Sequence, residues 1–180
     1  MPRPISNSLF ACVASCAALW ALSACSPAFN WRDVRPEGTR LGLLLPCKPD
    51  KAQRTVPLGG KPAELRMLGC DAGGATFAVA VADLADASQL ADVLVQWQNL
   101  TLANMKASPA TEVLALKLPG AAVQPPAVLV KARGQRADGS AVSGQAAYFS
   151  QGSQVFQVVL YADKVTPELS ETFFSSLKFE

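Results

Sequence analysis

The fold of this chain is decided by the stretch ATFAVAVADLADASQLADVLVQWQNLTLANMK, residues 75–106. Its first part, residues 75–83, alternates bulky side chains with alanines, which predicts a strand with one bulky face and one small face. Because small side chains let a helix approach a sheet closely, we expect the following helix to pack on the alanine face. The bulky positions are Phe77, Val79 and Val81, and the alanines are Ala78, Ala80 and Ala82.

The segment that follows this strand has the apolar spacing of a helix over residues 87–106. Asp86, with Gln89 three residues later, forms a capping-box pattern, and Pro109 prevents the helix from continuing. Trp97 lies at the middle of the apolar stripe. Such a stripe is usually part of a core, so we interpret Trp97 as a packing residue and not as part of a cofactor site.

Strand and turn signals on both sides of this unit complete a predicted antiparallel sheet. Asp138-Gly139 is a strong hairpin signal, and Thr166 with Pro167 marks the start of a second helix, whose buried face carries Leu169, Phe173 and Phe174. Residues 108–126 form a long connection with one helical turn or an edge strand. The remaining predicted strands are residues 40–45, 54–58, 64–70, 127–136, 141–149 and 155–161, with an extended end at 177–180.

The order of these elements is four strands, a long helix, three strands and a C-terminal helix. Since the hairpins are short, we predict an α+β fold: a mainly antiparallel sheet of about seven strands with two helices packed on it. This order and the ending Thr172-Phe173-Phe174-Ser175-Ser176-Leu177-Lys178-Phe179 resemble the PsbP-like sandwich proteins found among bacterial lipoproteins and photosystem accessory proteins. The resemblance implies an accessory or binding role without catalysis and supplies no functional residues.

The N-terminal segment has the features of a secretory signal peptide. Arg3 precedes an apolar run, residues 9–21, that is interrupted only by Ser15. A helix that stays in a membrane needs about 20 apolar residues, so this run is too short. We therefore predict that residues 1–24 are a signal peptide that is removed on export.

The residues at the end of the predicted signal peptide, Leu22-Ser23-Ala24, together with the following Cys25, resemble the lipobox of bacterial lipoproteins. The resemblance implies cleavage before Cys25, a diacylglycerol thioether on its thiol and acylation of the new amino group. Ser26 in the second mature position resembles the sorting signal for the outer membrane, facing the periplasm. The alternative is ordinary cleavage after Ala28, which would give a soluble periplasmic protein.

These features divide the chain into a signal peptide, a lipidated tether over residues 25–38 and a single domain over residues 39–180. The tether has no sustained periodicity and contains structure-breaking residues. Within it, Trp31 is either an interfacial anchor or packs against the domain.

Two cysteines, Cys47 and Cys70, remain after the signal peptide and the lipidated cysteine are set aside. In an oxidising compartment two thiols within reach usually form a disulfide, and we predict this pairing, with Cα atoms less than about 7 Å apart. The chain-entropy treatment gives such a loop roughly 3.5 kcal/mol of stabilisation. Two buried free thiols or a two-cysteine metal site are the alternatives.

Composition excludes several classes of function. The 180 residues contain no histidine, which removes Ser-His-Asp and Cys-His catalysis and the histidine-containing metal sites. A formal net charge of +2 argues against a nucleic-acid binder. Asp83, Asp86 and Asp92 surround the start of the first helix, where the helix dipole stabilises negative charge, so capping is favoured over catalysis.

One basic stripe remains as a candidate anion-binding face. Three cations, Lys131, Arg133 and Arg136, lie along one predicted strand, residues 127–136. A solvated strand face is the favoured interpretation, and an anion or lipid-headgroup site is the alternative.

We therefore expect a lipid-anchored envelope protein with a structural or interaction role and no catalytic activity, cofactor or metal. Its partner would be another envelope protein or peptidoglycan. The alternative is a binding module for a small apolar or anionic ligand between the sheet and the long helix. A pocket of roughly 300 Å³ or more lined by Phe77, Trp97 and Tyr148 would favour binding, and a filled core would favour interaction.

Overall fold

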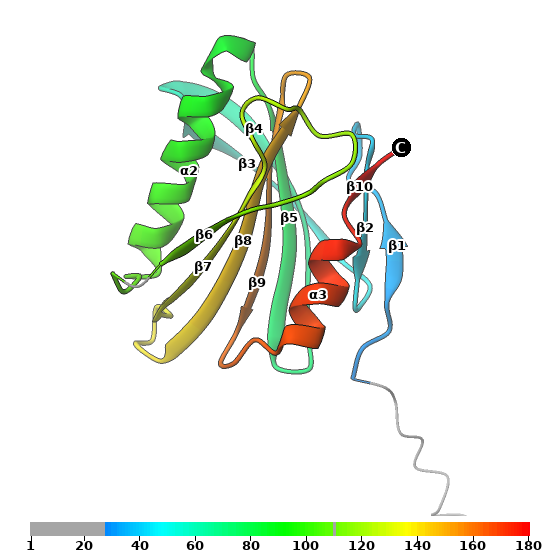
Figure 1. The fold of residues 1–180 in the computed structure, drawn as a ribbon, viewed down its shortest axis with the longest axis vertical. Helices are drawn as coiled ribbons and strands as arrows, with labels where there is room; N and C mark the ends of the chain where they lie inside the picture. Colours follow the sequence, from blue (N-terminus) through cyan, green and yellow to red (C-terminus); the bar gives the residue numbers. More distant parts are fainter. Residues whose placement is uncertain (1–27, 110) are drawn as a thin grey trace, which may run out of the picture.

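The computed structural model describes residues 28–109 and 111–180, so the segment predicted to be a signal peptide and the predicted lipidation site, Cys25, lie outside the described residues. Its centre is an antiparallel sheet of seven strands in the order β3-β4-β5-β9-β8-β7-β6 (Figure 1). The predicted α+β class is confirmed. The strands are β3 (Asp50–Leu58), β4 (Lys61–Ala72), β5 (Ala75–Asp83), β6 (Glu112–Ala115), β7 (Val128–Gln135), β8 (Ala141–Gln151) and β9 (Gln154–Ala162).

The two faces of this sheet are covered by different elements. A 3₁₀ turn, η2 (Ala87–Gln89), leads into helix α2 (Leu90–Asn104), which covers one face. Helix α3 (Pro167–Ser175) covers the other face together with a small sheet (Figure 1). The strands of this small sheet are β1 (Arg32–Val34), β2 (Leu41–Leu45) and β10 (Lys178–Phe179).

The alternation along β5 explains how both faces become filled. Phe77, with its neighbours at every second position, belongs to the core cluster under α3, where its ring makes an edge contact with Phe173 at a centroid distance of 5.1 Å. Ala80 and Ala82 belong to the cluster that contains Trp97. The helix therefore lies on the alanine face, as predicted, because small side chains admit it closely.

One predicted strand occupies a different sheet. Residues 40–45 were expected in the main sheet, but β2 is the central strand of the small sheet, paired with β1 and β10. The seventh place in the main sheet belongs to β6, the edge-strand alternative for the 108–126 connection. In the small sheet Leu41, Leu43 and Leu45 are at most 1% exposed, because they pack in the core cluster that also contains Phe77 of the large sheet and Phe173 of α3.

The predicted tether is shorter than the sequence indicates, because the domain begins at Phe29 and not at residue 39. The Phe29 ring stacks on Trp31 with centroids 5.9 Å apart, and Trp31 makes an edge contact with Phe77, also at 5.9 Å. Of the two alternatives for Trp31, packing against the domain is the one observed. A pair of aromatic residues and a three-residue strand carry too little periodicity for a pattern to reveal them.

The two helix starts follow local hydrogen bonding. The Asp86 carboxylate accepts hydrogen bonds from the Ser88 hydroxyl (2.7 Å) and the Ser88 backbone N–H (2.9 Å), and these bonds lower the pKa of Asp86. Asp86 is thus an N-cap, without the reciprocal bond from Gln89 that a capping box requires. Thr166 caps α3 as predicted, since its hydroxyl accepts from the Leu169 N–H at 3.3 Å.

Neither helix in the described part of the chain has the length and apolar character needed to cross a membrane.

Candidate functional site

A groove of about 660 Å³ runs along one side of α2, between this helix and the large sheet. Helix α2 forms one wall, and the β3–β4 hairpin forms the other. The floor comes from the strands β5, β8 and β9, and the β7–β8 hairpin closes one end. The helix side chains are Trp97, Leu100, Thr101, Asn104 and Met105; the opposite wall is Val56, Pro57, Leu58 and Leu65; the floor is Thr76, Val142, Gln157 and Tyr161; the hairpin end is Gln135, Arg136 and Ala137.

The groove exists because α2 is held over one half of the sheet. The helix packs on β8 and β9 and ends against β7, where the Gln135 N–H donates to the Met105 carbonyl at 2.7 Å. Gly134 permits this approach, since a Cβ atom there would lie 2.0 Å from the same carbonyl oxygen. The β3–β4 hairpin lies beyond the helix and is left to form the opposite wall.

A hydrogen-bond network ties the groove floor to the helix. Gln157 on β9 donates to the Thr101 hydroxyl at 2.8 Å and to the Tyr148 hydroxyl at 3.0 Å. The Thr101 hydroxyl donates to the Trp97 carbonyl at 2.9 Å. Burial raises the pKa of Tyr148, which stays neutral. These polar groups are engaged with one another and fix the wall of the groove.

Tyr161, on the groove floor, is not part of this hydrogen-bond network. Burial, with a smaller contribution from Tyr148, raises the pKa of Tyr161 to about 12, so its hydroxyl is neutral at physiological pH. Among the described residues, no hydrogen bond involves this hydroxyl. It is therefore available to donate a hydrogen bond to a molecule in the groove.

The side chain of Arg136, at the hairpin end of the groove, is held by other groups of the protein. Its guanidinium forms an ion pair with Asp163 (2.7 Å) and donates to the Ala141 carbonyl (2.9 Å) and the Ser140 hydroxyl (3.3 Å). An anion in the groove would have to compete with these partners.

The predicted basic stripe is not continuous. Lys131 and Arg133 lie on β7, on the face away from α2, because Val130 and Ala132, at the alternate positions of the strand, face the helix side. Arg136 lies beyond the end of β7, and the alternation of side chains separates it from the other two. The candidate anion-binding face is thus divided: two cations share a strand face, and the third is paired with a carboxylate.

The three residues expected to line one pocket lie in three places. Trp97 borders the groove and is 8% exposed. Phe77 is buried on the opposite face of the sheet. Tyr148 faces α2 but borders a second cavity of about 530 Å³, between the N-terminal half of α2 and the Pro125-Pro126 segment. Sequence patterns place Trp97 correctly but miss Tyr161 and the β3–β4 wall, because no local signal shows which strands the helix leaves uncovered.

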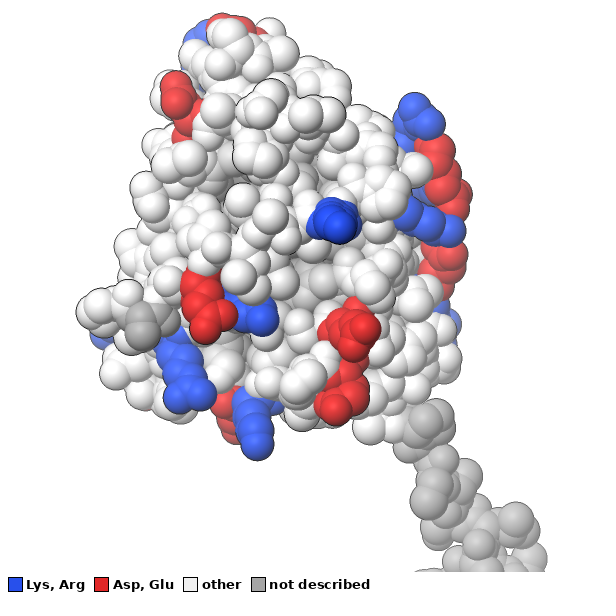
Figure 2. Space-filling model, in the orientation of Figure 1, with Lys and Arg blue, Asp and Glu red and all other residues white. Residues whose placement is uncertain are grey.

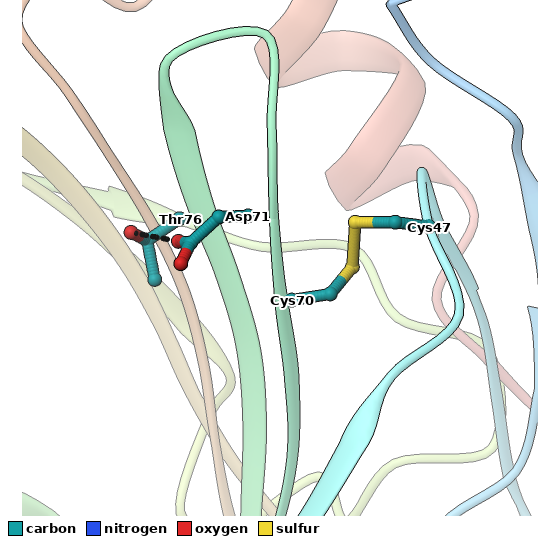
Figure 3. The surroundings of a disulfide bond; sticks show 4 residues. All are labelled: Cys47, Cys70, Asp71 and Thr76. Carbon is teal, nitrogen blue, oxygen red and sulfur yellow. Dashed lines mark hydrogen bonds between the residues drawn. A yellow bond between two sulfur atoms is a disulfide. The ribbon is translucent and has the colours of Figure 1, made fainter.

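The predicted disulfide is confirmed. Cys47 and Cys70 are joined, with S–S and Cα–Cα distances of 2.08 Å and 6.0 Å (Figure 3). Cys47 follows β2 and Cys70 lies on β4, so the bridge links the small sheet to the large one. Near it, the Thr76 hydroxyl donates to the Asp71 carboxylate at 2.5 Å (Figure 3).

The acidic residues near the start of α2 are accounted for locally. Asp83 pairs with Arg66 at 2.8 Å, Asp86 caps the helix start, and Asp92 lies in the first turn of α2. Within residues 28–109 and 111–180, no three His, Cys, Asp or Glu side chains are grouped so that they could hold a metal ion.

No protein-family model matches the chain, and no curated protein matches it. Among solved structures, it is similar to the crystal structure of PA94 from Pseudomonas aeruginosa, a protein of unknown function. The two are 18% identical, the match covers 78% of this chain and 85% of the other, and the TM-score is 0.34. A likeness of this size contributes nothing to the assignment of function.

Proposed function

We propose that this protein is a lipid-anchored envelope protein whose domain binds a small, largely apolar ligand without catalysis. The observation that carries the proposal is the groove of about 660 Å³ beside Trp97. Its volume falls in the range of small-molecule sites, about 300–1,000 Å³, and apolar walls with a few polar groups are typical of such sites.

The lining of the groove indicates the chemistry of the ligand. The β3–β4 wall and the helix wall are mostly aliphatic, which suits an elongated hydrocarbon body. The free hydroxyl of Tyr161 suits a hydrogen-bond acceptor, such as a carboxyl or ester oxygen, on the same ligand. Because Arg136 already has a carboxylate partner, a neutral or weakly polar end group fits better than a strongly anionic one.

The lipid anchor is part of this proposal and is supported by the sequence Leu22-Ser23-Ala24-Cys25. The oxidised pair Cys47–Cys70 agrees with export, since disulfides persist in oxidising compartments. We place the protein at the outer membrane, facing the periplasm. The test is Cys25→Ser, which should abolish both membrane fractionation and labelling with radioactive fatty acid. Unchanged detergent partitioning of this variant would contradict the anchor.

Ligand binding is tested with a brominated fatty acid, which quenches tryptophan fluorescence on contact. The mature chain, residues 25–180, carries Cys25→Ser so that no detergent is needed, and Trp31→Phe so that Trp97 is its single tryptophan. Saturable quenching of Trp97 is expected.

A matched pair of variants locates the binding. Asn104 lines the groove, and Asn99 lies on the outer side of the same helix. Asn104→Phe should weaken binding at least about tenfold, which corresponds to a loss of about 1.4 kcal/mol in binding free energy. Asn99→Phe should leave binding unchanged. Equal affinities of the two variants, or no quenching at all, would refute the groove as the binding site.

A protein-interaction role is the second candidate, and one observation favours it. Strand β6 is an outer strand of the large sheet, and its side chains Val113 and Leu114 are 54% and 42% exposed. Such an edge can accept a strand from another protein. Crosslinking in intact cells, followed by identification of the attached protein, would test this role.

A further inference from the structure

We propose that one end of the domain rests on the membrane that anchors it, and that the groove takes an acyl-chain lipid from that membrane. This end is formed by the β4–β5 turn and the β7–β8 hairpin. The inference rests on the proposed lipid anchor and on the proposed binding function.

The first argument is the shortness of the connection between the anchor and the domain. Phe29 packs against Trp31 and Phe77, and a Cβ atom at Gly73 would lie 2.5 Å from the Phe29 ring. The chain therefore enters the domain at the β4–β5 turn. Four residue steps separate Phe29 from Cys25, and a fully extended chain covers at most about 14 Å in that number. The β4–β5 turn is consequently held close to the headgroups.

The second argument is that the groove reaches the same end of the domain. Thr76, on its floor, follows Gly73 by three residues and is the register partner of Tyr161. In the next row of the sheet, Ala162 pairs with both Ala75 and Ser143. The β7–β8 hairpin, the C-terminal end of α2 and the start of the blue ribbon, where the described residues begin, lie at one end in Figure 1.

The direction of the groove then matches the structure of a bilayer lipid. The polar group of the groove, the Tyr161 hydroxyl, lies at the end of the domain that faces the membrane in this proposal. The ester or carboxyl oxygen of a lipid would be at the same level. The aliphatic wall of Val56, Pro57 and Leu58 lies toward the β3–β4 turn, at a distance from that end. An acyl chain that enters from the membrane would place its hydrocarbon along this wall.

Charge plays little part in this arrangement. Lys, Arg, Asp and Glu side chains are intermixed at this end of the molecule in Figure 2, and Arg136 is paired with Asp163. Mixed charges give no strong attraction to anionic lipids. The anchor itself holds the domain at the surface, so loading should depend on the length of the connection.

The experiment therefore lengthens the connection. The complete lipidated protein, carrying Trp31→Phe, is placed in vesicles of phosphatidylethanolamine and phosphatidylglycerol with brominated acyl chains. A second form has a Gly/Ser insertion of about 20 residues between Ala28 and Phe29, whose r.m.s. span is about 25 Å. We expect the insertion to slow the quenching of Trp97 at least about fivefold, because the tether lowers the effective concentration of the bilayer at the groove. Asn104→Phe should remove the quenching in both forms, and Asn99→Phe should change neither.

A solution measurement separates the two ways of failing. The unacylated chain, with and without the insertion, is titrated with free brominated fatty acid, and equal affinities are expected. If both forms bind the fatty acid but quenching from the membrane is equally fast, the membrane-facing groove is refuted and the binding function stands. If the unacylated chain binds no fatty acid, the proposed function fails, and the inference fails with it.

Discussion

Replacing Gly134 with alanine tests how closely the end of α2 is held against the sheet. A Cβ atom at this position would lie 2.0 Å from the Met105 carbonyl oxygen and 3.2 Å from the end of the Met105 side chain. The first contact is with backbone, which cannot rotate away as a side chain can. The C-terminal turn of α2 must therefore move from the sheet by more than 1 Å to reach an ordinary contact of about 3.4 Å.

The size of the effect follows from what this movement breaks. The Met105 carbonyl accepts from the Gln135 N–H at 2.7 Å, and a displacement of that size lengthens this bond beyond a useful distance. A lost hydrogen bond costs about 1 kcal/mol, and overpacking with a backbone shift costs about 1–3 kcal/mol. We expect Gly134→Ala to lower the free energy of unfolding by about 2–4 kcal/mol, which corresponds to a drop in Tm of about 5–15 °C.

The assay is urea unfolding of the unacylated mature chain, followed by circular dichroism, together with thermal scans. Gly42→Ala is the matched control: Gly42 also lies in a strand, but its added Cβ would meet its nearest neighbour, the Lys178 side chain, at 3.6 Å. This control should shift stability by less than about 1 kcal/mol. If Gly134→Ala is as stable as Gly42→Ala, the close contact between α2 and β7 is wrong, and with it the explanation of the groove.

Three further predictions concern the core, the disulfide and the C-terminal ion pairs. Trp97→Ala should cost about 3–5 kcal/mol, because a ring that is 8% exposed leaves a cavity, and acrylamide should quench wild-type Trp97 poorly; a variant of unchanged urea midpoint would contradict its packing role. Cys70→Ser should lower stability by roughly 3.5 kcal/mol under oxidising conditions, while a reducing agent should bring the wild type to the level of the variant; a wild type insensitive to reduction would count against this. Hydrogen bonds from Lys178 and Arg35 lower the pKa of Glu180 below its ordinary 4.5, so the stabilisation that this carboxylate provides is present above pH 4.5 and is lost as the pH falls through the lowered value. Glu180→Gln should therefore have a lower Tm than wild type at pH 7 and the same Tm in strong acid, and a difference that persists in acid would show that charge is not its cause.

Much of the fold could be predicted because its main elements carry strong local signals. The alternation of Phe77, Val79 and Val81 with alanines specifies a strand and both of its faces, since side chains in a strand alternate regardless of what covers them. The cap at Thr166 involves only neighbouring residues, so the start of α3 is also visible in the sequence. The Cys47–Cys70 pair was predictable for a different reason: it is the one pairing left if the other three cysteines belong to the predicted signal peptide and lipid anchor.

The arrangement of the groove was decided by tertiary structure alone. The position of α2 over β8 and β9 depends on contacts between residues far apart in the sequence, such as Gln135 with Met105 and Gln157 with Thr101. No local pattern around Tyr161 shows that its hydroxyl faces an open space, because the space is made by a hairpin more than 90 residues earlier. Phe29 is similar: its apolar character is visible in the sequence, but its place depends on Gly73, which has no side chain to exclude the ring. Local periodicity thus determined which residues form elements and which face is buried, and long-range packing determined where the helix leaves the sheet uncovered, because a helix stripe specifies a face to bury and not the strands that bury it.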